Sequence, residues 1–118
     1  MGMDNYRDVG ARGNPADLNR RLHMLAGLAQ MHGKVPAFTE TGQERIPNTD
    51  WWPRVLLGHI RADEQASRVA YVVVWRNARP SHCYAPYPGH PSVSDFVKFT
   101  EAPRVLLEDE LPRLYRRP

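Results

Sequence analysis

The side chains best suited to chemistry in this 118-residue sequence stand at the ends of short apolar segments. Glu40 follows an apolar run and lies between two threonines, and Asp4 and Tyr6 close the opening segment. Trp75 and Arg76 end a third apolar run. A phenol that donates to a carboxylate keeps it ionised, and a guanidinium donates several hydrogen bonds to hydroxyls. With an indole as an apolar plate for a sugar ring, this set indicates a carbohydrate site.

Each of these residues also has an ordinary structural interpretation. Tyr6 and Trp75 fit core aromatics, Asp4 fits a turn residue, and Glu40 alone fits a surface carboxylate. We expect no metal and no cofactor, because His82 and His90 match no ligand spacing and have no evident third ligand. The single cysteine excludes an internal disulfide, and no base or orienting group stands near it in the sequence.

The elements that would position these residues alternate in type along the chain. A strand end over residues 1–6 precedes a helix that Asn14 caps, with Pro15 in its first turn and Gly33 as its stop. Residues 35–38 read as a buried strand, and a second helix starts at Asn48 or Thr49. Residues 69–75 form an apolar, β-branched run typical of a strand buried on both faces of a parallel sheet. The first helix has one apolar stripe: Leu18, Leu22, Leu25, Ala26 and Ala29.

The remainder of the chain is a long loop and a short helix. Residues 76–91 are rich in proline and aromatic side chains, and loops of that length are usually functional. Ser92 or Ser94 is expected to cap the helix that follows, and residues 104–115 to pack as a helical or irregular tail. Trp51 and Trp52 are interpreted as helix-packing residues, with room for one exposed indole.

This order predicts an α/β fold of parallel strands with right-handed crossover helices. Strand ends converge at one face of a parallel barrel, so the five candidate side chains are expected to face one cleft. Two and a half βα units cannot close a barrel, and the first strand begins at its own end. We therefore interpret the chain as the C-terminal piece of a larger α/β barrel.

The charge of the chain does not indicate a nucleic-acid-binding function. The net charge is +3 with a pI near 9.4, spread along the chain. The one basic cluster, Arg113, Arg116 and Arg117, fits a solvated terminus better than a nucleic-acid patch. We expect no membrane span and recognise no signal peptide in this chain, since a charge follows Met1 closely.

Four segments in series resemble family-26 glycoside hydrolases, the β-mannanase family. Residues 1–118 would then be a C-terminal fragment of the catalytic barrel. The resemblance implies a partial (β/α)8 TIM barrel, namely the last three βα units (strands 6–8). The segments are MGMDNY at 1–6; TETG at 39–42 with DWW at 50–52; YVVVWRNA at 71–78; and HCYAPYPGHP at 82–91 with DF at 95–96.

The resemblance also implies an activity and a role for each candidate. Such enzymes hydrolyse β-1,4-mannosidic bonds in mannan, glucomannan and galactomannan with retention of configuration. Glu40 matches the nucleophile and Tyr6 the tyrosine that orients it. Trp75 matches the floor of the subsite at the cleavage point, Asp4 a neighbouring carboxylate and Arg76 a sugar contact. The resemblance also implies a secreted or cell-surface location and no cofactor.

One part of the family pattern does not occur in this sequence. The acid/base glutamate of the family stands on the fourth strand, in a His-Glu pair near an aromatic cluster, and these residues carry no such segment. Retaining hydrolysis needs both carboxyl groups. We therefore expect the chain to be inactive alone and to need the N-terminal portion of the barrel. The alternatives are a non-catalytic carbohydrate-binding or truncated product of the same fold, and a free-standing small α/β protein of unrelated function.

Overall fold

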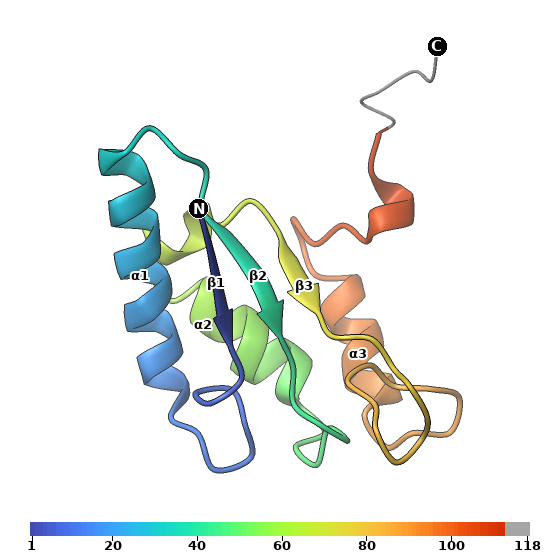
Figure 1. The fold of residues 1–118 in the computed structure, drawn as a ribbon. Coiled ribbons are helices and arrows are strands. Elements are labelled where there is room, and N and C mark those ends of the chain that lie inside the picture. The colour runs from blue at the N-terminus through green and yellow to red at the C-terminus, as the bar shows by residue number, and fades with distance from the viewer. Residues whose placement is uncertain (113–118) are drawn as a thin grey trace.

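A computed structural model describes residues 1–112 of the chain, which form a three-stranded parallel sheet in the order β1-β2-β3 (Figure 1). The strands are β1 (Gly2–Asn5), β2 (Ala37–Thr41) and β3 (Val72–Val74). The helices are α1 (Pro15–Met31), α2 (Gly58–Ile60) and α3 (Val93–Thr100), with a π-helix η1 (Trp51–Leu57) and 3₁₀ turns η2 (Ala66–Arg68) and η3 (Glu108–Glu110). The predicted parallel α/β architecture is confirmed.

Helix α1 forms as the sequence predicts. The Asn14 side chain accepts a hydrogen bond from the backbone N–H of Ala16, and Pro15 occupies the first turn, where its missing N–H is not needed. The chain leaves the helix at Gly33, whose φ of 60° is one that glycine adopts without strain. All five residues of the predicted stripe are buried: Leu18, Leu22, Leu25, Ala26 and Ala29.

Strand β2 lies further along the chain than residues 35–38, where the sequence predicts it. Its ladder with β1 begins where the Ala37 N–H donates to the Met1 carbonyl at 2.9 Å, and it continues to Thr41 opposite Asn5. Val35 precedes the ladder and is largely exposed. The position of the partner strand thus decides these bounds, and Glu40 lies within β2 instead of after it.

Strand β3 is shorter than predicted and is covered on one face. Only Val72–Val74 form the strand, whereas the run over residues 69–75 suggests a longer one buried on both faces. Val72 and Val74 pack against the core, while Tyr71, Val73 and Trp75 are exposed. Within residues 1–112 the helices cover a single face of the sheet, since α2 and η1 lie behind the strands in Figure 1.

The second helix starts at Trp51 as a π-helix and continues into α2. Both Trp51 and Trp52 are buried, so neither indole is the exposed one that the sequence allowed for. The Trp52 ring meets Phe96 of α3 edge-on, with centroids 4.7 Å apart, and lies 5.3 Å from Phe99. This aromatic cluster joins α3 to η1 and packs α3 against the core.

The long loop is folded back on itself in an ordered way. Asn77 donates to the Ala85 carbonyl at 2.8 Å and accepts from two backbone N–H groups, of Tyr84 and Ala85. Helix α3 follows Ser92, as predicted, although the Ser92 side chain bonds to His90 instead of capping the helix. The predicted basic cluster (Arg113, Arg116 and Arg117) lies outside the described residues. No helix among residues 1–112 is both long and apolar enough to cross a membrane.

Candidate active site

An open hollow of about 800 Å³ lies where the loops leave the carboxyl ends of the strands. One wall comes from the loop after β1, and the other from the loops after β2 and β3. In a parallel α/β structure this end of the strands is where ligand sites form. The lining residues are Tyr6, Arg7, Gly10, Ala11, Arg12, Gly13, Glu40, Gly42, Gln43, Glu44, Trp75, His82 and Tyr84.

Tyr6 and Glu40 are in direct contact in this hollow. The Tyr6 hydroxyl donates to Glu40 Oε1 at 2.8 Å. The contact follows from the parallel ladder, because Tyr6 comes directly after β1 and Glu40 lies in the neighbouring strand. Burial, and then the hydrogen bond to Glu40, raise the pKa of the Tyr6 phenol above its usual value. The phenol is therefore a firm donor that holds one oxygen of the carboxylate in place.

Trp75 adds an apolar surface to the same hollow. Trp75 is the first residue after β3, and its backbone N–H donates to the carbonyl of Thr41, the last residue of β2, at 2.9 Å. The Trp75 side chain is 39% exposed. Part of the indole is thus free to meet a ligand next to the Glu40 carboxylate.

The structure brings Tyr6, Glu40 and Trp75 together, and it leaves Asp4 and Arg76 outside the lining of the hollow. Asp4 Oδ1 accepts from the Thr39 hydroxyl at 2.8 Å, and Asp4 lines a second, smaller hollow of about 270 Å³ beside β1. The Arg76 guanidinium lies 5.9 Å from the centre of the Trp75 ring, where it interacts with the indole. Asp4 and Arg76 therefore do not line this hollow, and their roles in substrate binding stay predictions.

Sequence reasoning missed three residues of the second wall: Glu44, His82 and Tyr84. His82 Nδ1 lies 2.7 Å from Glu44 Oε1. The Tyr84 ring meets Tyr6 edge-on at 5.9 Å and His82 at 5.4 Å between centroids. The one available signal was the density of His and Tyr in residues 76–91, which indicated a functional loop without naming its members.

Gly42 allows this wall to approach the strand. A Cβ at this position would lie 2.5 Å from Tyr84 Cδ1, so any side chain here would displace the Tyr84 ring. Its φ of 151° is also one that favours glycine. The glycine after the threonine-flanked carboxylate is therefore needed for close contact between the β2 loop and the long loop.

Among residues 1–112, no group of three or more His, Cys, Asp or Glu side chains converges in a way that would hold a metal ion. The two loop histidines have other partners. His82 pairs with Glu44, and His90 bonds to the Ser92 hydroxyl at 2.8 Å and to the Arg45 carbonyl at 3.2 Å. The functional groups that line the hollow include the carboxylates of Glu40 and Glu44, the phenols of Tyr6 and Tyr84, the His82 imidazole and the Trp75 indole.

No protein-family model matches this sequence. Solved structures do match it closely. The chain is 35% identical to a GH26 β-mannanase from Bacteroides ovatus, over 99% of its own length and 35% of that chain, with a TM-score of 0.76. It is 34% identical to a modular endo-β-1,4-mannanase from Cellulomonas fimi, over 94% of its length and 26% of that chain, with a TM-score of 0.81.

A third structure gives the same result. The chain is 30% identical to GH26C from a Muricauda species, over its whole length and 33% of that chain, with a TM-score of 0.83. The 118 residues thus span about a third of these proteins or less. The resemblance that the four sequence segments indicate is confirmed over nearly the whole chain. On these grounds the chain belongs to glycoside hydrolase family 26, of which it represents a segment.

Proposed function

We propose that these residues carry the nucleophile of a retaining β-1,4-mannanase acting on mannan, glucomannan or galactomannan. The hydrogen bond from Tyr6 to Glu40, in an open hollow with one exposed indole, is the observation that carries this proposal. Two of the matched proteins are a β-mannanase and an endo-β-1,4-mannanase, which supports the substrate class. In this proposal residues 1–118 are the last three βα units, strands 6–8, of a (β/α)8 barrel.

The proposed reaction follows from what a fixed carboxylate can do beside a sugar. Glu40 attacks the anomeric carbon, and the glycosidic C–O bond breaks as the Glu40 ester forms. A second carboxylic acid protonates the departing oxygen and then removes a proton from water, which displaces Glu40 and restores both groups. In retaining enzymes the two carboxyl groups stand about 5 to 5.5 Å apart. We propose that this second group lies on another part of the barrel.

The unpaired edges of the sheet are consistent with such a larger barrel. Within the described residues β1 pairs with β2 alone, and β3 pairs with β2 alone. Free edges of this kind are normally paired or covered in native proteins. We therefore propose the remaining barrel strands as the structural partner, mannan as the substrate, and a secreted or cell-surface location. Neither a nucleic acid nor a cofactor has a part in this proposal.

Assays of mannan hydrolysis test this proposal. The full-length protein, meaning the longest natural chain that contains these residues, should release reducing sugar from mannan with retention of configuration. The 118-residue chain alone should be inactive, because loss of acid/base assistance alone removes about 10² to 10⁴ in rate. Binding of mannan by the full-length protein without cleavage would favour the non-catalytic alternative instead.

We expect Tyr6→Phe in the full-length protein to lower kcat/KM for mannan about 10- to 100-fold. A hydrogen bond to a charged group contributes about 1.5 to 3 kcal/mol, and this one holds one oxygen of the Glu40 carboxylate. Steady-state kinetics on a soluble manno-oligosaccharide measures the loss. Tyr71→Phe is the matched control, because Tyr71 is exposed and does not line the hollow. Equal activity of Tyr6→Phe and the parent would contradict the assigned role.

We expect Trp75→Ala to weaken productive sugar binding at the site. Covering an aromatic side chain contributes about 2 kcal/mol, which corresponds to about a 30-fold loss in kcat/KM. Stability should change little, because Trp75 is already 39% exposed. The same kinetic assay, with urea unfolding alongside, separates the two effects. A large loss of stability with unchanged kinetics would show that Trp75 is a core residue.

A further inference from the structure

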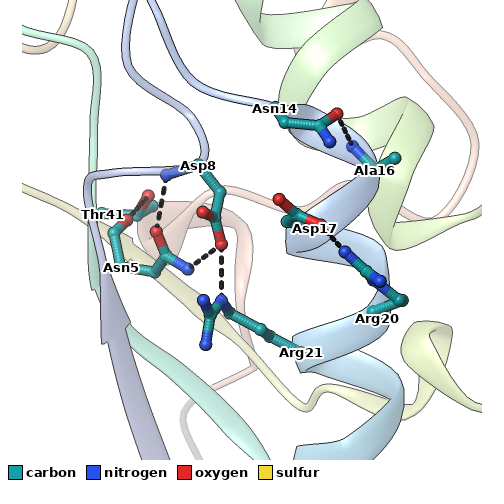
Figure 2. A network of polar contacts seen from close by, with 8 residues as sticks. All are labelled: Asn5, Asp8, Asn14, Ala16, Asp17, Arg20, Arg21 and Thr41. Atoms are coloured by element: carbon teal, nitrogen blue, oxygen red, sulfur yellow. Dashed lines mark hydrogen bonds and ion pairs between the residues drawn. The ribbon is translucent and has the colours of Figure 1, made fainter.

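Asp8 is a buried carboxylate that takes no part in the proposed reaction. It is 3% exposed and lines the smaller hollow instead of the one that holds Glu40. Asp8 Oδ2 accepts from Asn5 Nδ2 and from Arg21 Nε, each at 2.7 Å, as Figure 2 shows. The two donors satisfy the hydrogen-bonding capacity of this buried oxygen, which would otherwise be costly to remove from water.

The contacts of Asp8 tie together three separate elements. Asn5 is the last residue of β1, Arg21 projects from α1, and Asp8 itself lies in the loop between them. Asn5 Oδ1 also accepts from the Asp8 backbone N–H at 3.0 Å, and the Thr41 hydroxyl of β2 donates to the Asn5 carbonyl at 2.8 Å. Figure 2 shows these bonds converging on the turn that follows β1. We call Asn5, Asp8 and Arg21 the loop brace.

The loop brace encloses the residue that contacts Glu40. Asn5 and Asp8 are bonded to each other by both side chain and backbone, so the two residues between them, Tyr6 and Arg7, sit in a closed turn. Tyr6 donates from this turn to Glu40 at 2.8 Å, and Arg7 lines the hollow beside it. The direction of the Tyr6 side chain therefore depends on the geometry that Asp8 imposes.

The same loop also packs closely against itself and the core. A Cβ on Gly13 would lie 2.3 Å from the Arg7 carbonyl oxygen and 2.4 Å from that of Asp8. Val9, the residue after Asp8, is fully buried. Its carbonyl accepts from the side chains of Gln43 and Trp51 at 3.1 and 3.0 Å. The loop after β1, which forms one wall of the hollow, is thus also held by buried hydrogen bonds to its backbone.

We infer that Asp8 is a positioning residue for the site: through the loop brace it holds Tyr6 against Glu40. The effect on hydrolysis rests on the proposed function, whereas the effect on Tyr6 does not. Displacement of a catalytic group by about 1 Å can reduce a rate about 10²-fold. Loss of the brace should therefore lower kcat far more than it raises KM, because Asp8 does not line the hollow that would receive the sugar.

The test is a double-mutant cycle between Asp8→Asn and Tyr6→Phe in the full-length protein. Asp8→Asn alone should lower kcat about 10- to 100-fold with KM within about threefold of the parent. In the Tyr6→Phe background the same change should have almost no further effect, since the hydroxyl that it positions is already absent. Additive losses, or an unchanged kcat, would overturn the inference.

Three further variants control for a loss of folding. Asp17→Asn removes a carboxylate that pairs with Arg20 on the same helix and makes no hydrogen bond to the loop brace, so it should leave kcat unchanged. Arg21 is half-exposed, so Arg21→Gln can be made without burying a new group, and it should repeat the effect of Asp8→Asn in weaker form. Arg21→Lys should recover most of the kcat that Arg21→Gln loses. Normal kinetics of Arg21→Gln would overturn the inference where Asp8→Asn does not fold.

A spectroscopic measurement tests the inference without using hydrolysis. With 3-fluorotyrosine incorporated, the ¹⁹F resonance of Tyr6 can be identified because it is lost in Tyr6→Phe. Asp8→Asn and Arg21→Gln should move this resonance toward that of the free amino acid, and Asp17→Asn should not. Inactivity of the parent would contradict the proposed function, whereas an unmoved Tyr6 resonance would contradict the role of Asp8.

Discussion

Replacement of Glu40 by Gln in the full-length protein is expected to reduce kcat for mannan by about 10⁴-fold or more. Gln keeps the size of the side chain and can still contact the Tyr6 hydroxyl, but its amide cannot form the glycosyl ester. Losses of this size follow when the nucleophile of a covalent mechanism or its direct partner is removed. Initial rates on a manno-oligosaccharide, with the fold checked by circular dichroism, measure the change.

Glu44 supplies the matched control for this substitution. It is the other carboxylate that lines the hollow, and its Oε1 is paired with His82 at 2.7 Å. Glu44→Gln removes a negative charge from the same hollow, yet it leaves the Tyr6–Glu40 contact in place. We expect a loss of less than about tenfold. If Glu44→Gln proved as damaging as Glu40→Gln, the nucleophile would not be uniquely assigned.

The largest loss of stability is expected for Trp52→Ala, at about 3 to 5 kcal/mol in the free energy of unfolding. Trp52 is 3% exposed and packs against Trp51, with ring centroids 4.9 Å apart, as well as against Phe96 and Phe99. Truncation leaves a cavity that this aromatic cluster cannot fill by collapse. Urea unfolding of the full-length protein, at constant m-value, measures the difference.

Trp75→Ala is the comparison for this prediction, because it removes the same side chain from an exposed position. Its free energy of unfolding should stay within about 1 kcal/mol of that of the parent. Trp52→Ala should in turn leave KM for mannan nearly unchanged in the fraction that folds. Similar losses of stability in the two variants would contradict the assignment of Trp52 to the core and of Trp75 to the ligand site.

The elements whose residues interact locally could be predicted from the sequence. Asn14, Pro15 and Gly33 act within a few residues of their own positions, and they define helix α1. The bounds of β2 and β3 could not be predicted in the same way, since strand ladders depend on partners distant in the chain. Residues 69–75 have the composition of a strand buried on both faces, but Tyr71, Val73 and Trp75 are exposed in the structure.

The part of the candidate site that lies at the strand ends could be predicted from the sequence. Tyr6, Glu40 and Trp75 stand at or near strand ends, and parallel pairing brings such residues together. Asp4 and Arg76 stand close to them in the sequence but do not line the hollow. Asp4 accepts from the Thr39 hydroxyl, and Arg76 lies over the Trp75 ring, and neither contact follows from residue type alone. Contacts such as that of Glu44 with His82, 38 positions apart, depend on the path of two loops that no local pattern specifies.

The role of Glu40 as nucleophile is tested most directly by trapping the intermediate. The full-length protein is incubated with a 2-deoxy-2-fluoro-mannosyl donor, which slows breakdown of the glycosyl-enzyme, and its peptides are analysed by mass spectrometry. We predict one fluoromannosyl group per protein, attached as an ester to the peptide that contains Thr39, Glu40 and Thr41. A stable adduct on a different residue, or turnover of mannan with inversion and no adduct, would contradict the role assigned to Glu40.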